Sequence, residues 1–508
     1  MRDFVQQQVR HVLGVRKGQT LPDDVPLKTL GLDSLMMNDL RARLERELQL
    51  RIAPAEIMRG DVTISSLSMA LMDRLQLNRV ADVIPQAAPS GEPETEADIV
   101  PLVPQCLAVV TEQKARQVLI GGRWRCDFAS CNYLGLDLHQ DVMAAIMPAV
   151  AAWGVHPSWT RLVASPAIYD ELEAELAKFL GAPDTLVFPS LSLLHLGVIP
   201  LLAGSQGVIL KDIQAHNSLI EACERARVNG TEVVDFRHND PASLDERLAA
   251  YPGARTKLIV IDGVYSMSGS YPPLPEFVRV AQRHGAQIYM DDAHGIGVIG
   301  GQPSPDLPYG RGGNGVVNYY GLRYDETPII YTAGLSKSFS SYGAFITCSG
   351  KAEKQKLAAA TTYIFSGPSP VASLASALAG LRVNAREGEA MRAQIYRLTR
   401  RLVDESRSLG FDVHSDNYFP IVSVPVGRTP LVVDACRLLW EHDILITPAV
   451  YPVVPKDRGV LRFSITAANT DDEIDRALEG LARVRKLVED AAVSSNHPLS
   501  GGERNQWN

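Results

Sequence analysis

Apolar residues in the first 80 positions recur at the spacing of amphipathic helices. Polar and charged residues fill the positions between them. The apolar positions form two sets, Phe4, Val5, Val9, Val12 and Leu13, then Leu35, Leu40, Leu44 and Leu48. This pattern predicts a separate helical unit over residues 1–80.

From about residue 106, short β-rich apolar runs alternate with helical patterns. The helical patterns cover residues 142–153, 169–180 and 276–284, and the last is followed by Gly285, a typical cap at a helix end. The β-rich runs are residues 117–120, 257–261, 287–290 and 328–332. Such alternation predicts an α/β domain over residues 106–372, with a mostly parallel sheet wrapped by helices.

The pattern changes again near residue 373, where long amphipathic helices precede three short β-rich runs, 420–424, 447–450 and 460–465. We expect a second, smaller domain over residues 373–490. Residues 81–105 are rich in proline, alanine, glutamate and serine, and this composition predicts a linker. Residues 491–508 are polar, and we expect a disordered tail there.

Composition excludes several classes of protein. The 508 residues carry a net charge of −8 without a basic run, so neither nucleic acid nor an anionic membrane is an expected partner. The run 186–204 is apolar, but Pro189, His195 and Pro200 interrupt it. We therefore expect a buried strand and helix there and no membrane span.

The six cysteines form no C-x-x-C pair and no spacing typical of a zinc site. The first residues lack the apolar segment of a secretory signal. We expect reduced thiols, no metal site and a cytoplasmic protein.

Candidate catalytic residues follow two of the β-rich runs. Asp291 ends one run and is followed by His294, and Lys337 follows the next run between two serines. Ligands of open α/β sheets bind at the carboxyl ends of the strands. A lysine amine, a carboxylate and an imidazole are the groups that a pyridoxal phosphate site requires, for the aldehyde, the ring nitrogen and the ring hydroxyl.

The same stretch contains a G-x-G-x-x-G pattern at Gly295, Gly297 and Gly300. In a dinucleotide site these glycines open a helix directly after the strand. Here an acidic pair and a histidine intervene, and prolines follow within Gly301–Pro305. We therefore reject the nucleotide interpretation.

The motif D-D-A-H-G-x-G-x-x-G, followed by S-K, resembles the α-oxoamine synthases, the family of 8-amino-7-oxononanoate synthase and serine palmitoyltransferase. The resemblance covers about residues 107–488. It implies a homodimer whose large domain has the aminotransferase-like fold type I, with a smaller carboxyl-terminal α+β domain. It also implies pyridoxal 5′-phosphate, with Lys337, His216 and His294 as catalytic residues and Asp291 as a cofactor ligand.

Further positions match the family's motifs. His216, in D-x-x-x-H, is implied to stack on the cofactor ring. Asn132, in N-Y-L-G-L, and Arg462 are implied to bind the amino-acid substrate, and a guanidinium suits a carboxylate.

The phosphate segment departs from the family pattern S-G-[YF]-x-A-N and reads Ser190-Leu-Ser-Leu-Leu-His195. The family's threonine before the lysine is Gly334. The loop Gly154–Arg161 also carries larger residues than the family's glycine-rich loop. Phosphate binding is thus expected to depend on Ser190, Ser192 and backbone amides.

The sequence L-G-L-D-S-L at residues 30–35 resembles the attachment motif of an acyl carrier protein of the polyketide-synthase type, a four-helix domain. Without this context, a serine after Asp33 is ordinarily a helix cap. The resemblance implies that Ser34 carries 4′-phosphopantetheine, attached by a phosphopantetheinyl transferase. The unit has 12 lysines and arginines against 10 aspartates and glutamates, and a tethered carrier needs little electrostatic steering.

These resemblances together predict an acyltransferase for biosynthesis that condenses an amino acid with an acyl thioester carried on Ser34, giving an α-aminoketone. An acyl-loading enzyme or a polyketide or fatty acid synthase is a possible further partner. Two alternatives stay open: another pyridoxal phosphate reaction, such as transamination or decarboxylation, and a non-catalytic carrier scaffold, against which Lys337 counts. The sequence names neither the amino acid nor the acyl chain.

Overall fold

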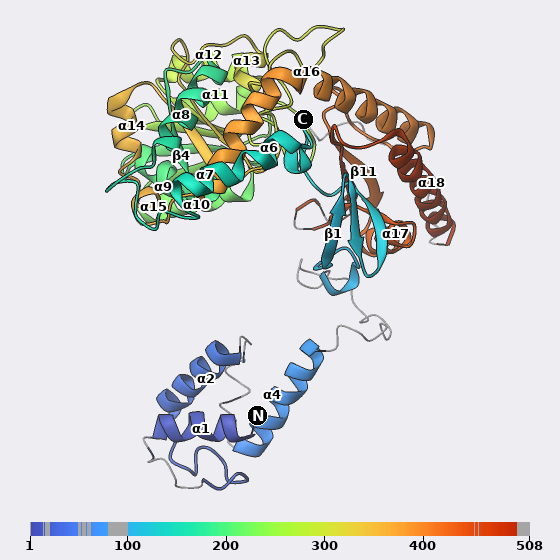
Figure 1. The fold of residues 1–508 in the computed structure, drawn as a ribbon. Helices are drawn as coiled ribbons and strands as arrows, with labels where there is room; N and C mark the ends of the chain where they lie inside the picture. Colours follow the sequence, from blue (N-terminus) through green and yellow to red (C-terminus); the bar gives the residue numbers. More distant parts are fainter. Residues whose placement is uncertain are drawn as a thin grey trace. The chain divides into compact units, whose positions relative to one another are not determined.

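The computed structural model of the chain describes residues 2–13, 15, 21–48, 52, 57, 62–79, 100–451, 453–455 and 457–494. The chain divides into two compact units, Met1–Gly91 and Glu92–Asn508 (Figure 1). Most of the expected linker, residues 81–99, lies outside the described residues, as do residues 495–508 of the expected tail. Residues 491–494, expected to be disordered, instead form the end of the last helix, which continues to Ser494.

The described part of the first unit is helical, as the spacing predicted. Its helices are α1 (Arg2–Leu13), α2 (Ser34–Leu48) and α4 (Ile64–Arg79). Their apolar faces share one core, and Val5, Val9, Leu40 and Leu44 are fully buried in it.

The start of α2 is determined by the residues before it. Gly31 has a φ of +99°, a conformation that favours glycine, and Leu32 is buried in the core. The Asp33 carboxylate accepts a 2.8 Å hydrogen bond from the Met36 amide and so caps the helix. Ser34 is consequently the first residue of α2.

A seven-stranded sheet forms the centre of the second unit (Figure 1). The strand order is β4-β10-β9-β8-β7-β5-β6, and β10 is antiparallel to both neighbours while the remaining pairs are parallel. The predicted mostly parallel sheet is thus confirmed. The strands are β4 (Asp184–Phe188), β5 (Val208–Asp212), β6 (Glu232–Phe236), β7 (Lys257–Asp262), β8 (Gln287–Asp291), β9 (Ile329–Gly334) and β10 (Ala344–Cys348).

Helices cover both faces of this sheet. In β7, Leu258 and Val260 join a core with α9 and α10, whereas Ile259 and Ile261 join the opposite core with α8, α11 and α12. A strand buried on both faces reads as a continuous apolar run, which is the pattern in the sequence. The helices are α6 (Gln140–Ala144), α7 (Ile146–Trp153), α8 (Ala167–Leu180), α9 (Leu191–Ala203), α10 (Asn217–Val228), α11 (Pro241–Ala249), α12 (Leu274–His284), α13 (Val316–Tyr319), α14 (Lys351–Leu357) and α15 (Thr361–Ile364).

Two predictions for single segments have different outcomes. The helix expected over 142–153 is interrupted at Ala145 and forms α6 and α7. The run 186–204 forms β4 and α9, as expected. No helix in the described ranges combines the length and apolar character needed to cross a membrane.

A second core lies in the carboxyl-terminal part. Its sheets have the orders β1-β2-β3-β12 and β11-β14-β13. Val103, Cys126 and Phe128 are buried in this core, and β3 pairs in parallel with β12. The sequence pattern placed residues from 106 onward in the large domain, but this pairing brings the 103–128 segment to the carboxyl-terminal core. The elements are η1 (Val100–Leu102), β1 (Val110–Lys114), β2 (Gln117–Ile120), β3 (Arg123–Asp127), β11 (Ile421–Gly427), α17 (Thr429–Glu441), β12 (Ile444–Leu445), β13 (Thr447–Ala449), β14 (Gly459–Ser464) and α18 (Asp471–Ser494). The short helix η2 (Leu136–Leu138) belongs to the core of the large sheet, in which Leu136 is buried.

The 38-residue helix α16 (Val371–Ser408) joins the two cores. Leu374 and Leu378 near its start are buried in the core of the large sheet, and Leu398 and Leu402 near its end are buried in the carboxyl-terminal core. One continuous helix therefore links the two layers between which the candidate site is built.

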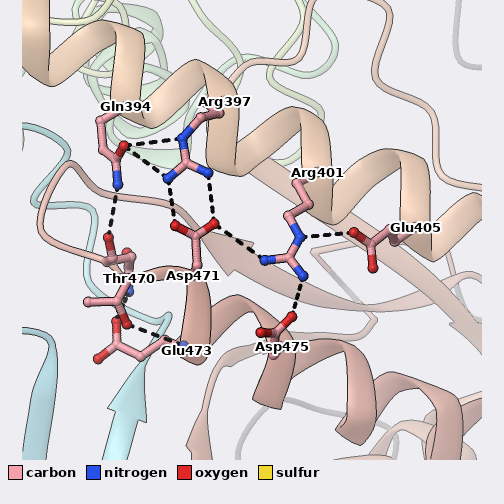
Figure 2. A network of polar contacts seen from close by, with 9 residues as sticks. Gln394, Arg397, Arg401, Glu405, Thr470, Asp471, Glu473 and Asp475 are labelled. Carbon is pink, nitrogen blue, oxygen red and sulfur yellow. Dashed lines mark hydrogen bonds and ion pairs between the residues drawn. The ribbon is translucent and has the colours of Figure 1, made fainter.

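Ion pairs attach α18 to α16 (Figure 2). The guanidinium of Arg397 donates to both carboxylate oxygens of Asp471, at 2.7 and 2.8 Å, and Arg401 contacts the same carboxylate at 3.3 Å. Thr470 and Glu473 form a reciprocal capping box at the start of α18, with bonds of 3.0 and 3.3 Å. The acidic first turn of α18 is thereby placed against basic residues of α16, which also suits the helix dipole.

Candidate active site

The carboxyl ends of β7, β8 and β9 meet at one edge of the large sheet. Asp262 ends β7, and it lies in register with Asp291, the last residue of β8. Lys337 follows β9 in a tight turn, in which the Ser340 amide donates to the Lys337 carbonyl at 3.0 Å. The ends of β8 and β9 therefore bring Asp291 and Lys337 to the same edge of the sheet, where the charge of Asp291 acts on the lysine amine.

Asp291 is buried, and its two carboxylate oxygens have different neighbours. Its Oδ1 accepts a 3.0 Å hydrogen bond from the Ala293 amide. Its Oδ2 lies 3.8 Å from Nε2 of His195, a fully buried residue of α9. A buried carboxylate requires such partners, because an unpaired one is costly.

Asp262 is a second buried carboxyl group beside Asp291, and its Oδ2 accepts a 2.9 Å bond from the amide of His216. Burial, followed by the charge of Asp291, raises the pKa of Asp262 well above its usual range. The neutral, protonated form of Asp262 is therefore favoured.

Lys337 is half-buried at the same edge. Burial lowers the pKa of its amine, and the nearby guanidinium of Arg462 acts in the same direction, while Asp291 opposes the shift. A lowered pKa leaves more of the amine neutral, which is the nucleophilic form.

His294 lies in the turn after β8, and its Nδ1 is 2.7 Å from the hydroxyl of Tyr133. Burial, with the charges of Lys337 and Arg462, holds the pKa of His294 well below its usual value. Burial also raises the pKa of Tyr133 well above its usual value. The contact therefore joins a neutral imidazole to a neutral phenol.

His216 precedes α10 and has an exposed ring, whose Nδ1 is 2.8 Å from the Ser218 hydroxyl. Its backbone is fixed by the bond to Asp262, so the imidazole is held at the open side of the strand ends.

Arg462 of β14 reaches the site from the carboxyl-terminal core. It is buried, and its terminal nitrogen lies 3.4 Å from Sγ of Cys131. Burial alone would raise the pKa of Cys131, but Arg462 and Lys337 outweigh it, and the pKa is lowered. Asn132 is buried and accepts a hydrogen bond from the Ser340 hydroxyl. The structure therefore brings Cys131, rather than its neighbour Asn132, against Arg462.

The first turn of α9 lies beside the end of β9. The Ser190 hydroxyl caps this 13-residue helix by accepting a 3.4 Å bond from the Leu193 amide, and Ser192 is exposed. A Cβ built at Gly334 would meet Leu191, Ser336 and Ala293 at 3.5, 3.7 and 3.8 Å, which are ordinary contacts. A helix start of this kind suits a phosphate group.

The sequence pattern overlooked several residues at this edge: Cys131, Tyr133, His195, Ser218 and Asp262. Asp262 could have been found, because it ends β7 as Asp291 ends β8. The other residues lie in helices and loops, so the end of an apolar run does not mark their positions in the sequence.

Comparison with known proteins assigns the class first. Residues 126–481 match the family model "Aminotransferase class I and II", and residues 3–71 match the model "Phosphopantetheine attachment site". The chain is thus a fold type I enzyme joined to a carrier domain.

The relatives specify the family. The 8-amino-7-oxononanoate synthases of Stutzerimonas stutzeri and Methylococcus capsulatus are each 33% identical to this chain; the matches cover 73% and 74% of it and 91% and 92% of the relatives. A solved serine palmitoyltransferase of Sphingomonas wittichii is 25% identical, with a TM-score of 0.71 over 83% of this chain and 99% of that one. The chain belongs to the α-oxoamine synthase family and carries an amino-terminal carrier domain.

The residues present fit the cofactor of this family. They provide an amine, a buried carboxylate, two imidazoles and a helix start at one sheet edge. The fully buried Nε2 of His195 also lacks a hydrogen-bond partner in the part of the chain that the structure describes. The enzyme uses pyridoxal 5′-phosphate, and its carrier domain uses 4′-phosphopantetheine.

Proposed function

We propose that this enzyme condenses an amino acid with an acyl thioester, releases the carboxyl group of the amino acid as CO2, and yields an α-aminoketone and a free thiol. The observation that carries the proposal is the Lys337 amine, whose pKa burial lowers and on which the charges of Asp291 and Arg462 both act. An amine in this setting can bind a carbonyl carbon and accept a proton.

The proposed cofactor contacts follow from the chemistry of each group. Lys337 would bind the aldehyde carbon, Asp291 the ring nitrogen and His294 the ring hydroxyl. His216 would lie on the ring face, and Ser190, Ser192 and the amides of α9 would bind the phosphate. When bound, pyridoxal phosphate accepts electron density from the substrate Cα.

Side chains of the protein would bind the substrate and transfer the proton. Arg462 would bind the substrate carboxylate through a planar pair of hydrogen bonds. Lys337 would take the proton from Cα, and Asn132 would hold the turn of Ser340 on which Lys337 depends. The acyl carbon bonds to Cα as its thiolate leaves and takes up a proton.

The proposed acyl donor is the arm on Ser34, attached by a phosphopantetheinyl transferase. The match of residues 3–71 to the attachment-site family and the capped start of α2 support it. An acyl-loading enzyme, or a polyketide or fatty acid synthase, would supply the acyl group, in cytoplasmic biosynthesis.

In the test, the full-length chain with both cofactors attached is incubated with an acyl thioester and each member of a panel of amino acids. We expect CO2 and free thiol in equal amounts. Lys337→Ala should abolish both, because the amine is lost, whereas Lys351→Ala, at an exposed lysine of α14, should leave both unchanged.

Other outcomes identify the alternatives. Release of CO2 without thiol indicates a decarboxylase, and a keto acid without CO2 indicates an aminotransferase. Full turnover by Lys337→Ala would mean that another group performs the proton transfer.

A further inference from the structure

A line of polar contacts runs beneath the candidate site from His216 to Asp291. The Ser218 hydroxyl lies 2.8 Å from Nδ1 of His216 and 3.1 Å from Nδ1 of His195. Nε2 of His195 then lies 3.8 Å from Oδ2 of Asp291. The two end residues of this line are the ones that would contact the ring face and the ring nitrogen of the cofactor.

His195 is well placed to act on Asp291. Its ring is fully buried and packs edge-to-face on Tyr289, with centroids 5.7 Å apart. Burial lowers the pKa of His195 to about 4, so the ring is neutral at pH 7 and carries a proton on one nitrogen only.

The Ser218 hydroxyl has a single proton and faces two imidazole nitrogens. When it donates to His195, Nδ1 of His216 must donate to it, and when it donates to His216, Nδ1 of His195 must donate to it. At any time, therefore, one of the two Nδ1 atoms carries a proton and the other does not.

Asp291 selects between these two arrangements. An ionised carboxylate only accepts, so it attracts a proton on Nε2 of His195. That leaves Nδ1 of His195 as an acceptor for Ser218, and Ser218 in turn accepts from Nδ1 of His216. The Ser218 amide donates to Nδ1 of His216 at 3.3 Å and favours the reverse arrangement. Asp291 acts on His195 as a charge 3.8 Å away and not through a hydrogen bond, and between buried groups such a charge outweighs a long amide hydrogen bond.

We propose that His195 is a positioning residue in a relay, His216–Ser218–His195–Asp291, through which the charge of Asp291 sets the tautomer of His216. The ring of His216 then presents an unprotonated Nε2 to the substrate side. This inference rests on the proposed placement of Asp291 and His216 in the site, but its test does not require turnover.

The relay predicts that Asp291→Asn moves the proton of each imidazole to the other ring nitrogen and reverses the direction in which the Ser218 hydroxyl donates. The Ala293 amide donates to the Oδ1 position, so the Asn carbonyl oxygen takes that position and its NH2 group faces His195. His195 must then accept at Nε2 and donate from Nδ1, and Ser218 donates to His216.

The experiment uses full-length protein labelled with ¹⁵N-histidine, without added cofactor, and reads the tautomers of His195 and His216 from their NMR shifts. We expect His216 protonated on Nδ1 in the wild type and on Nε2 in Asp291→Asn and in Ser218→Ala. His284, bonded to Asp245 at 2.6 Å, is the internal control and should not change. The same His216 tautomer in wild type and Asp291→Asn overturns the relay.

Two substitutions at His195 separate positioning from packing. His195→Gln keeps an acceptor for Ser218 and a donor for Asp291, so it should retain the wild-type tautomer of His216. His195→Leu removes both and should change the tautomer and raise the dissociation constant of pyridoxal phosphate by about tenfold. Identical behaviour of the Gln and Leu variants, both folded, would show that His195 only fills space.

Discussion

Gly334 shows how a single missing side chain bears on cofactor binding. It ends β9 beside the first turn of α9, and its surroundings leave room for a Cβ at ordinary contact distances. The strand conformation there is open to other residues, since Gly334 is not among the glycines with positive φ.

We expect Gly334→Thr to tighten pyridoxal phosphate binding. The added hydroxyl can donate to the phosphate dianion, and a hydrogen bond to a charged group contributes about 1.5 to 3 kcal/mol. The dissociation constant should fall by about tenfold or more in a cofactor titration. Gly334→Val is the matched control, because it has the same shape without the hydroxyl, and equal affinities of the Thr and Val variants would exclude the hydrogen bond.

At the scale of elements, α7 and the loop after it are apolar but uncovered. None of the eight residues of α7 is buried, and the exposed apolar side chains in this region are Met147, Trp153, Val155, Trp159, Leu162 and Val163. Monomeric proteins rarely expose a large contiguous apolar patch. We propose that a second copy of the chain covers this surface.

Met147→Glu should weaken this self-association. Met147 is 69% exposed in the single chain, and a charge without a partner in an apolar interface is costly. Sedimentation equilibrium should show a dimer for the wild type and a dissociation constant at least about tenfold higher for the variant. Val228→Glu, at an 88% exposed valine at the end of α10, should have no effect. A wild-type monomer at micromolar concentrations would disprove the proposal.

On the scale of the whole molecule, the carrier and the enzyme are two compact units of one chain. Joining two binding partners in one chain commonly gives effective concentrations of order millimolar. The arm on Ser34 is therefore expected to outcompete a free acyl carrier.

We expect Ser34→Ala to abolish single-turnover condensation from the acyl-loaded arm, because the attachment hydroxyl is gone. Product formation after addition of amino acid measures this, and cofactor absorbance should stay unchanged. Wild-type chain without the phosphopantetheine arm is the control and should behave like Ser34→Ala. If Ser34→Ala uses acyl-CoA as fast as the wild type uses its own arm, the carrier is not the donor.

Local features of the sequence determined the position and type of the main elements. Each strand of the large sheet that carries a site residue is an apolar run buried on both faces, and such a run ends where a polar residue appears. Asp291 was therefore predictable from β8 alone, and the helix over 276–284 from its spacing and from Gly285.

Tertiary structure decided which residues from distant segments meet. The Ser464 amide at the end of β14 donates to the Phe128 carbonyl at 2.8 Å, which holds the segment of Cys131 near Arg462. The packing of α9 and α10 places His195 and Ser218 close to Asp291. Local periodicity encodes which face of an element is buried, but it does not encode which partner covers that face. The chain by itself therefore determined its strands, helices and strand-end carboxylates, whereas burial and proximity, which shift the pKa of Lys337 and His294, exist only after the segments have packed together.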